Sequence, residues 1–503
     1  MIKFKFTVTF SKKANNFAKT LEKMLRLCYI SIARLILNSV SIKTFIQGEN
    51  KMQIVLIGAG KVGKQITDRL LSEKHDITVV DTDSNRLNSL INSHDILCIQ
   101  GNGAVYDIQL EAGVEKADVV IATTSEDEIN ILCCTLAKKL GAKRCIARIR
   151  NPEYYYQLGF MREELGLNMI VNPEYAAASE IMRILLLPDA AQVEVFANGR
   201  VELIEFKIGD NNPAVGIPLS DIYKKYKIQI LVCTVERDGK VIIPDGSFIL
   251  NPGDRISIAC NHKAAETFFK KIGSTREKIK TVMLVGGGKI AVYLAKQLVE
   301  LGMEVKIIEN DYKRCRELSE LLSDVSIIYA DGTDHITLKE EGVESVDAFA
   351  ALTGIDEENM IMALYAQTKN VSKVIAKVNR GSYITLSDHI GIDSIISPKQ
   401  LGANNIVGYV RAMKNSENSS NVETIYKVLD NKAEALQFII HENTSYTDKP
   451  LREMRTHSDV IIASIVRNRK SIIPNGNDCL KRGDNVVVVT SERTLHDLKE
   501  IFI

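Results

Sequence analysis

The stretch that decides the fold reads Gln53-Ile-Val-Leu-Ile-Gly-Ala-Gly-Lys-Val-Gly63. It places the spacing Gly58-x-Gly60-x-x-Gly63 between a strand predicted over 53–57 and a helix predicted over 61–72. In such a turn the first glycine permits a tight bend, the second lets a pyrophosphate approach the backbone, and the third lets the helix pack closely on the strand. The stretch therefore predicts a dinucleotide-binding turn, with the phosphates at the N-terminus of the helix.

An acidic residue follows where this kind of site needs one. Asp81 ends the next predicted strand, 76–81, and stands 18 residues after Gly63. A carboxylate at this position accepts hydrogen bonds from ribose hydroxyls, and it repels a 2′-phosphate. The pattern favours NAD(H) or an adenine mononucleotide over NADP(H). The alternative is a domain of the same fold that binds nothing.

The residues around the glycine turn alternate between strand and helix patterns. A helix predicted over 84–93 is followed by strands predicted over 95–100 and 119–123, which indicates right-handed βαβ units on a parallel sheet. After residue 192 the pattern changes. Strands are predicted over 201–208, 229–237 and 255–260, separated by the turns Asp238-Gly239, Asp245-Gly246 and Pro252-Gly253. These features predict a small α+β domain rich in hairpins.

Both parts of this unit occur a second time. The first stretch returns as Thr281-Val-Met-Leu-Val-Gly-Gly-Gly-Lys-Ile-Ala291, and Glu309 repeats the acidic position 18 residues after Ala291. The segment 244–254, which begins Pro-Asp-Gly and ends Pro-Gly-Asp, returns as 474–484. We therefore predict an α/β chain with two tandem Rossmann-like doubly wound domains, each followed by a small α+β domain. The predicted segments are 52–188, 189–275, 279–415 and 416–503.

Composition narrows the class of protein. The formal net charge is +1, with 45% hydrophobic and 25% charged residues, which argues against a nucleic-acid or lipid binder. Nine cysteines without a CxxC pair fit a reducing cytosol. The apolar runs are strand-sized, so we expect no membrane span.

The first 51 residues differ from the rest of the chain. They hold ten Lys or Arg residues against only Glu22 and Glu49. We interpret residues 1–51 as a basic extension outside the folded unit and expect the physiological start at Met52. A basic amphipathic helix near 17–37 that touches an anionic membrane surface is the alternative.

Residues suited to redox catalysis are not apparent in the sequence. The eight histidines form no metal-binding spacing, and we expect His75 and His94 to be solvated at helix ends. Glu126, Asp127 and Glu128 precede a helix predicted over 129–140, where they favour the helix dipole. The small domains are too short to suggest a substrate domain. We therefore predict a nucleotide sensor that is not an enzyme and has no metal site, with an NAD-dependent dehydrogenase as the alternative.

Several spaced motifs resemble one protein family. They are Gly58 to Gly63, Thr78 to Asp81, Gln100 to Gly103, Ala122 to Asn130 and Ile146 to Tyr154, together with the large-small duplication. From Met52 onward the chain resembles the TrkA-type peripheral subunits of Trk potassium-uptake systems, which are built from RCK (regulator of potassium conductance) domains.

The resemblance implies a function and partners. It implies a regulatory subunit that binds NAD(H), and also ATP or ADP, and forms a homo-oligomeric ring, expected to be a tetramer. The ring would lie on the cytoplasmic face of the cell membrane and gate an integral-membrane potassium transporter of the TrkH or TrkG type. A regulatory module of another cation channel or an antiporter is the alternative within the same fold.

The resemblance also assigns site residues. In the first unit they are Gly58, Ala59, Gly60, Lys61 and Val62 for phosphate, Asp81 for ribose, Thr124 and Ser125 beneath the nucleotide, and Arg148. In the second unit they are Gly286, Gly288, Glu309 and Thr353, with Gly354 and Lys377 in place of the serine and the arginine. These replacements predict weaker binding in the second unit.

Two of these segments carry alternatives of their own. Arg148 ends a strand predicted over 145–149, where its planar fork suits a phosphate, and an ion pair to Glu128 or to a neighbouring chain is the alternative. A helix predicted over 175–187 carries apolar residues at helical spacing. It is either an assembly surface or ordinary packing between the large and small domains.

Overall fold

The structure is a computed structural model that covers the region after the basic extension. It describes residues 51–155, 157, 162, 164–197, 199–272, 278–381, 383, 391–392, 394–414, 420–429, 432–491, 495 and 497–503. The predicted extension, apart from Lys51, therefore lies outside the described residues.

The first large domain is a parallel sheet of six strands in the order β3-β2-β1-β4-β5-β6. Its strands are β1 (Gln53–Ile57), β2 (Asp76–Asp81), β3 (Leu97–Gln100), β4 (Val119–Ala122), β5 (Arg144–Arg148) and β6 (Met169–Val171). Helices α2 (Lys61–Ser72), α3 (Ser84–Ile91), α4 (Tyr106–Glu111) and α5 (Asp127–Leu140) connect them. The central strand β4 is wholly buried because helices cover both faces of the sheet, as its run of apolar residues predicts.

The second large domain repeats this arrangement in the order β14-β13-β12-β15-β16-β17. Its strands are β12 (Thr281–Val285), β13 (Glu304–Glu309), β14 (Ser326–Tyr329), β15 (Ala348–Ala351), β16 (Lys373–Lys377) and β17 (Ser394–Ile396). Its helices are α11 (Lys289–Glu300), α12 (Tyr312–Leu321), α13 (His335–Glu340) and α14 (Asp356–Thr368). In both domains the order of the strands reverses beside the strand that carries the glycine turn, where open α/β sheets bind their ligands.

The small domains are antiparallel sheets of five strands each, in the equivalent orders β10-β9-β11-β8-β7 and β18-β19-β22-β20-β21. The first has β7 (Gln192–Phe196), β8 (Val201–Lys207), β9 (Leu231–Arg237), β10 (Lys240–Ile242) and β11 (Arg255–Cys260), with helices α9 (Leu219–Tyr226) and α10 (His262–Lys271). The second has β18 (Ser420–Val428), β19 (Ala433–Ile440), β20 (Val460–Arg467), β21 (Lys470–Ile472) and β22 (Asn485–Thr490). The predicted fold class is confirmed, and the exact domain boundaries stay predictions.

The Gly-Asp ending that both small domains share, at 253–254 and 483–484, has a structural reason. Its aspartate, Asp254, is buried and accepts two hydrogen bonds from the Arg237 guanidinium at 2.8 and 2.7 Å. Asp484 and Arg467 form the same two-bond pair at 2.8 and 2.7 Å in the second small domain. Each pair fastens the turn before the last strand to the neighbouring strand of the same sheet.

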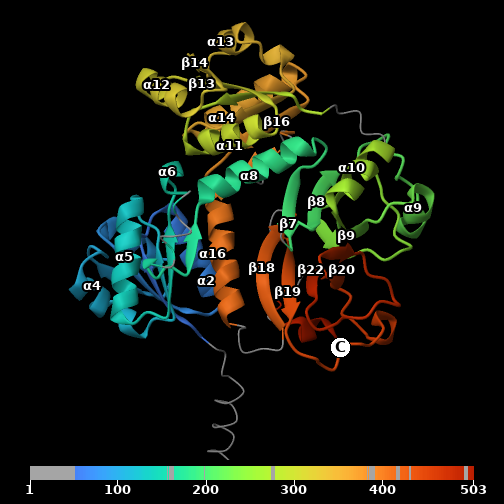
Figure 1. Cartoon of the computed structure of the whole chain (residues 1–503), viewed down its shortest axis with the longest axis horizontal. Coiled ribbons are helices and arrows are strands. Elements are labelled where there is room, and N and C mark those ends of the chain that lie inside the picture. The colour runs from blue at the N-terminus through green and yellow to red at the C-terminus, as the bar shows by residue number, and fades with distance from the viewer. Residues whose placement is uncertain are drawn as a thin grey trace, which may run out of the picture. The chain divides into compact units, whose positions relative to one another are not determined.

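The last helix of each large domain packs on the other large domain. Helix α8 (Pro173–Leu186) lies against α11 of the second unit, and α16 (Pro398–Lys414) lies against α2 of the first unit and against β18 (Figure 1). On α8, Ile181 and Ile184 are fully buried in a core that continues into the second large domain. Burial of each such side chain stabilises the fold by about 1.5–3 kcal/mol.

This exchange corrects the interpretation of the helix predicted over 175–187. Its apolar residues Ile181, Ile184, Leu185 and Leu187 are all buried within the chain, so they offer no free assembly surface. They also do more than join a large domain to its own small domain, because the core that holds them includes residues of α11. The two units are thus braced against one another by both exchanged helices.

The two small sheets share a further core. Phe196 and Leu203 of the first pack with Ala435 and Val487 of the second. Polar bonds cross the same boundary, including one from the Ala197 backbone N–H to the Gln437 side chain at 2.7 Å.

Candidate functional site

The first glycine turn lies between β1 and α2, and each glycine meets a different environment. Gly58 adopts a φ of +105°, and an added Cβ would lie 2.9 Å from the Thr123 carbonyl carbon. At Gly63 an added Cβ would lie 2.0 Å from the Gly58 carbonyl oxygen. At Gly60 a Cβ would meet no atom within 4 Å. The first and third glycines are therefore required by the packing of the turn, whereas the second leaves open space above the backbone.

The open space lies at the start of α2. Gly60 caps this helix with no side-chain hydrogen bond to its first amides. Backbone N–H groups at a helix start, with the positive end of the helix dipole, attract an anion. Lys61 is exposed there and Val62 is buried. The N-terminus of α2 thus has no side-chain cap, and no side chain covers the backbone at Gly60.

The carboxylate of Asp81 holds this turn in place. It is 7% exposed, and its Oδ2 accepts a hydrogen bond of 2.6 Å from the Ala59 backbone N–H. Its Oδ1 accepts a second bond of 2.8 Å from the Asp83 N–H. The half-exposed Arg86 places Nη1 3.7 Å from Oδ2. Each carboxylate oxygen has a second lone pair, so Asp81 keeps acceptor capacity toward a ribose hydroxyl while it anchors the loop.

Thr124 is positioned by a residue that the sequence reasoning did not single out. Asn130 on α5 is fully buried, and its Oδ1 accepts bonds from the Thr124 backbone N–H at 2.7 Å and from its hydroxyl at 2.8 Å. The Asn130 Nδ2 group donates to the carbonyls of Thr124 and Arg148 at 3.3 and 2.9 Å. This side chain ties the end of β4 to the end of β5. The sequence could have indicated this role, because an asparagine stands at the equivalent position, Asn359, in the second unit.

Ser125 and Asp127 take part in the same edge of the sheet. The Ser125 carbonyl accepts a hydrogen bond from the Arg150 side chain. Asp127 is buried and accepts bonds of 2.8 Å from the backbone N–H groups of Arg150 and Asn151. Asp127 therefore does more than favour the helix dipole, because it also fastens the loop that follows β5.

Arg148 pairs with Glu174 and not with Glu128, which was one of the alternatives to a phosphate contact. Its guanidinium lies 3.5 Å from Glu174 at the start of α8, and its Nε is buried without a hydrogen bond in the structure. Burial lowers the pKa of Arg148, partly offset by the Glu174 charge. Glu128 instead accepts a hydrogen bond from the Tyr154 hydroxyl.

The second unit reproduces this geometry with substitutions. Gly286 has a φ of +100°, and a Cβ at Gly288 would again meet no atom within 4 Å. Glu309 accepts a bond of 2.7 Å from the Gly287 N–H, as Asp81 does from Ala59. The third position is Ala291, whose side chain is fully buried.

The support beneath the second turn is also repeated. Asn359 accepts the Thr353 N–H and hydroxyl at 2.9 and 2.8 Å and donates to the Lys377 carbonyl at 2.9 Å. Gly354 stands where the first unit has a serine, and a Cβ there would meet no atom within 4 Å. The Lys377 ammonium donates to the Leu352 carbonyl at 3.1 Å, and burial lowers its pKa.

One cavity of about 200 Å³ lies between the two units, beside Val62 of the first turn and Gly288, Lys289 and Ile290 of the second. The first unit contributes to it Val62, Arg148, Pro173 and Glu174. The second unit contributes Gly288, Lys289, Ile290, Leu352, Lys377, Asn379, Pro398 and Lys399. Four of these side chains are cationic and one is acidic. Burial, and repulsion by Lys61 among others, lower the pKa of Lys399 to about 8. The cavity is therefore a basic site shared by the predicted phosphate loops of both units.

One sequence prediction about histidine is wrong. His75 is 3% exposed, and its Nδ1 accepts a bond of 3.3 Å from the Met52 N–H. His94 lies 2.7 Å from Asp68 at the surface end of its helix. Both lie at the opposite end of their strands and helices from the glycine turn, so neither belongs to the site.

Two kinds of feature are absent from the described part of the chain. Within it, no helix combines the length and the apolar character that a membrane crossing requires. No group of three or more His, Cys, Asp or Glu side chains is arranged there to hold a metal ion.

The sequence of each unit matches two known domain families. Residues 54–173 and 282–398 match the TrkA-N domain, and residues 203–273 and 435–503 match the TrkA-C domain. The chain is also 31% identical to the Trk system potassium uptake protein TrkA homolog 1 of Methanosarcina mazei, over 90% of this chain and 100% of that protein. The chain belongs to the TrkA family.

Bacterial members give the same result. The Trk system potassium uptake protein TrkA of Haemophilus influenzae is 31% identical over 90% of this chain and 98% of its own length. Membership in the TrkA family thus rests on almost all of the described chain, including both glycine turns.

Solved structures support the fold independently of close sequence similarity. A structure of the GsuK channel shares 17% identity with a TM-score of 0.59, over 88% of this chain and 78% of that one. The GsuK channel bound to NAD has 16% identity and a TM-score of 0.59, over 96% and 87% of the two chains. The described TrkA-family chain therefore has the architecture of an RCK protein.

Proposed function

We propose that this TrkA-family chain is a cytoplasmic regulatory subunit that gates a membrane potassium-uptake transporter in response to NAD(H), ATP or ADP. The observation that carries the proposal is the basic cavity between the two units, which is lined by Val62 of the first phosphate loop and by Gly288, Lys289 and Ile290 of the second. The names of its relatives, which are potassium-uptake proteins of Trk systems, support the transport role. The fold shared with a channel described as bound to NAD supports the choice of ligand.

The residues present fit a nucleotide. We assign the first phosphate site to Gly58, Ala59, Gly60, Lys61 and Val62, the ribose contact to Asp81, and the support beneath the nucleotide to Thr124, Ser125 and Arg148. The uncovered backbone at Gly60 accommodates a phosphate, because nothing lies where a side chain would project. When bound, the nucleotide supplies the negative charge of its phosphates. The Asp81 carboxylate disfavours the extra phosphate of NADP(H).

The second site uses Gly286, Gly288, Glu309 and Thr353. It is the weaker of the two because Lys377 replaces Arg148 and already donates to the Leu352 carbonyl. A lysine presents a point charge in place of a planar fork, so it holds a phosphate with less geometric specificity.

The proposed regulation rests on the charges that line the cavity and on the contacts between the two units. Arg148, Lys289, Lys377 and Lys399 line the shared cavity and repel one another at short range, whereas an anion among them relieves that repulsion. Because α8 and α16 brace each unit on the other, a change at the cavity is transmitted to both. A ligand shifts the balance of two arrangements only if it binds them with different affinity. ATP and ADP, or NADH and NAD, differ in charge and therefore shift it differently.

The partner and the assembly are part of the same proposal. We infer an integral-membrane subunit of the TrkH or TrkG type, a homo-oligomeric ring expected to be a tetramer, and a position on the inner face of the cell membrane. No nucleic-acid partner is proposed, because the net charge of +1 gives no electrostatic basis for one.

Potassium uptake tests the proposal. Cells in which this chain is deleted are complemented with the wild type, with Asp81→Ala, or with the control Asp95→Ala, which alters an exposed carboxylate outside the site. The wild type and the control should restore uptake, and Asp81→Ala should restore less. Equal uptake in the deleted and complemented cells would overturn the transport role. Steady consumption of NADH with a hydroxy or amino acid would instead favour a dehydrogenase.

A further inference from the structure

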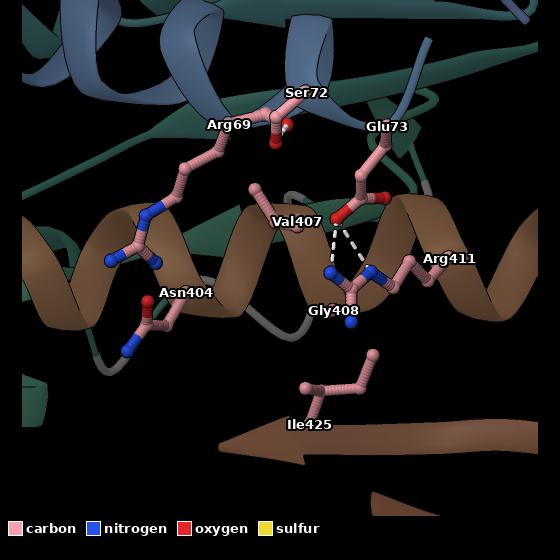
Figure 2. Close-up of a pocket in the computed structure, with 8 residues that line it drawn as sticks. All are labelled: Arg69, Ser72, Glu73, Asn404, Val407, Gly408, Arg411 and Ile425. Carbon is pink, nitrogen blue, oxygen red and sulfur yellow. Dashed lines mark hydrogen bonds and ion pairs between the residues drawn. The ribbon is translucent and has the colours of Figure 1, made fainter. Parts of the chain in front are cut away.

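A second cavity lies at the other end of α2, away from the glycine turn. It has a volume of about 220 Å³ between α2, α16 and β18 (Figure 2). Its lining residues are Arg69, Ser72, Glu73, Asn404, Val407, Gly408, Arg411 and Ile425. None of these residues belongs to the phosphate loops, so the cavity is separate from the proposed nucleotide sites.

One arginine of this cavity is fully engaged. The Arg411 guanidinium bonds Glu73 through two nitrogens and Glu434 at 3.1 Å. All three side chains are less than a tenth exposed. Arg411 therefore joins α2, α16 and β19, and its charge is balanced by two carboxylates.

The other arginine is not engaged. Among the described residues, the Arg69 guanidinium has no hydrogen bond or ion pair, although burial and the charge of Arg411 lower its pKa. Figure 2 shows it directed toward Asn404 and away from the pair between Glu73 and Arg411. The Oδ1 atom of Asn404 is buried and has no hydrogen-bond partner in the structure. The Asn404 Oδ1 atom is an acceptor, so the donor group of this cavity that lacks an acceptor within the described part of the chain is the Arg69 guanidinium.

The remaining wall is apolar. Val407 and Gly408, which lie between Asn404 and Arg411 on α16, and Ile425 of β18 supply the apolar part of the lining. An added Cβ at Gly408 would lie 3.6 Å from the Ile425 backbone nitrogen, so the glycine lets α16 lie close to β18. A cavity of about 150 Å³ in another protein accommodates a benzene molecule, so about 220 Å³ leaves room for a ring-sized body and a carboxylate. A guanidinium binds a carboxylate through two parallel N–H···O bonds.

We propose that this cavity binds a small organic acid, with its carboxylate on Arg69 and its carbon body against Val407, Gly408 and Ile425. Because α2 begins at the first glycine turn and ends at this cavity, occupation would also alter nucleotide affinity, a consequence that rests on the proposed function. The binding itself is independent of that function and is tested without nucleotide.

The test is calorimetric titration of the full chain with benzoate, and separately with benzamide and inorganic phosphate. We expect benzoate to bind the wild type, and Arg69→Gln to weaken it at least tenfold. The control Lys64→Gln, which alters an exposed cation on the same helix, should bind as the wild type does. Asn404→Ala should weaken binding less than Arg69→Gln. Thermal unfolding of each variant verifies that it is folded.

Three outcomes would overturn the proposal. They are the absence of benzoate binding to the wild type, equal binding by Arg69→Gln, and binding of benzamide as tightly as benzoate. Binding of phosphate in the absence of benzoate binding is a form of the first outcome, because it would replace the organic acid with an inorganic anion.

Discussion

Because the space above Gly60 is open, a methyl group added there should affect nucleotide binding without affecting the fold. Gly60 has φ −66° and ψ −175°, which alanine adopts without strain, and an added Cβ meets no atom within 4 Å. Gly60→Ala should therefore leave the turn intact. The methyl group would nevertheless occupy the side from which a phosphate approaches the backbone.

Two opposing contributions decide how much Gly60→Ala changes the free energy of unfolding. Replacement of glycine by alanine at a compatible position stabilises by about 0.4–1 kcal/mol through the unfolded chain. Alanine is a poorer N-cap than glycine, which offsets this by a similar amount. We expect the free energy of unfolding to change by less than about 1 kcal/mol. Nucleotide affinity should fall at least tenfold, or about 1.4 kcal/mol.

The matched comparison is Gly63→Ala in the same turn. Its Cβ would lie 2.0 Å from the Gly58 carbonyl oxygen, so the backbone must shift. Overpacking of this kind destabilises by about 1–3 kcal/mol. Gly288→Ala repeats the Gly60 experiment in the second unit, where a Cβ is again unobstructed.

The assays are urea unfolding and calorimetric titration with NADH, ATP and ADP. Wild-type affinity in a chain carrying both Gly60→Ala and Gly288→Ala would refute the assignment of the phosphate sites. A loss of more than about 2 kcal/mol of stability in Gly60→Ala alone would refute the argument that this glycine serves the ligand and not the fold.

Three further predictions concern buried polar groups. Burial raises the pKa of Glu180 to about 7 and of Glu194 to about 8, above the value of 4.5 that each has when unfolded. Between pH 4.5 and 8 the folded chain therefore binds more protons than the unfolded chain, so its stability falls as the pH rises through this window. From pH 5 to 9 the melting temperature of Glu194→Gln should fall less than that of the wild type. Arg411→Ala leaves Glu73 buried without its partner, so it should lower the free energy of unfolding in urea by about 3–5 kcal/mol. An unchanged free energy of unfolding would contradict the role of the buried pair. Asn130→Ala should lower the free energy of unfolding by about 1–3 kcal/mol because it leaves the Thr124 backbone N–H without an acceptor. A stability equal to that of the wild type would contradict the role of the Asn130 hydrogen bonds.

Local patterns in the sequence predicted the parts of the fold that depend on neighbouring residues. Strand β1, helix α2 and strand β2 have the bounds that the alternation and the glycine spacing indicated. The duplication extended the same inference to the second unit. These features are encoded within short stretches, because backbone geometry and side-chain periodicity decide them.

Contacts between distant segments were not predictable in this way. The apolar spacing of Ile181 and Ile184 shows that one face of α8 is buried, but not that α11 of the other unit covers it. The partner of Arg148 is Glu174 and not Glu128, because the start of α8 reaches the end of β5 only in three dimensions. The burial of His75 was missed for a similar reason, since its ring accepts a hydrogen bond from Met52, 23 residues earlier in the chain. In each case the outcome depends on contacts between segments that are distant in the sequence.

Potassium flux measured against nucleotide concentration tests the central claim most directly. The membrane partner is reconstituted in vesicles, and uptake is recorded with the wild-type chain or with the chain carrying Gly60→Ala and Gly288→Ala, as NADH, ATP or ADP is added. We predict that nucleotide changes the uptake supported by the wild type and leaves that supported by the double variant unchanged. An identical nucleotide response in both, or no dependence of uptake on the chain at all, would contradict a nucleotide-sensing regulator.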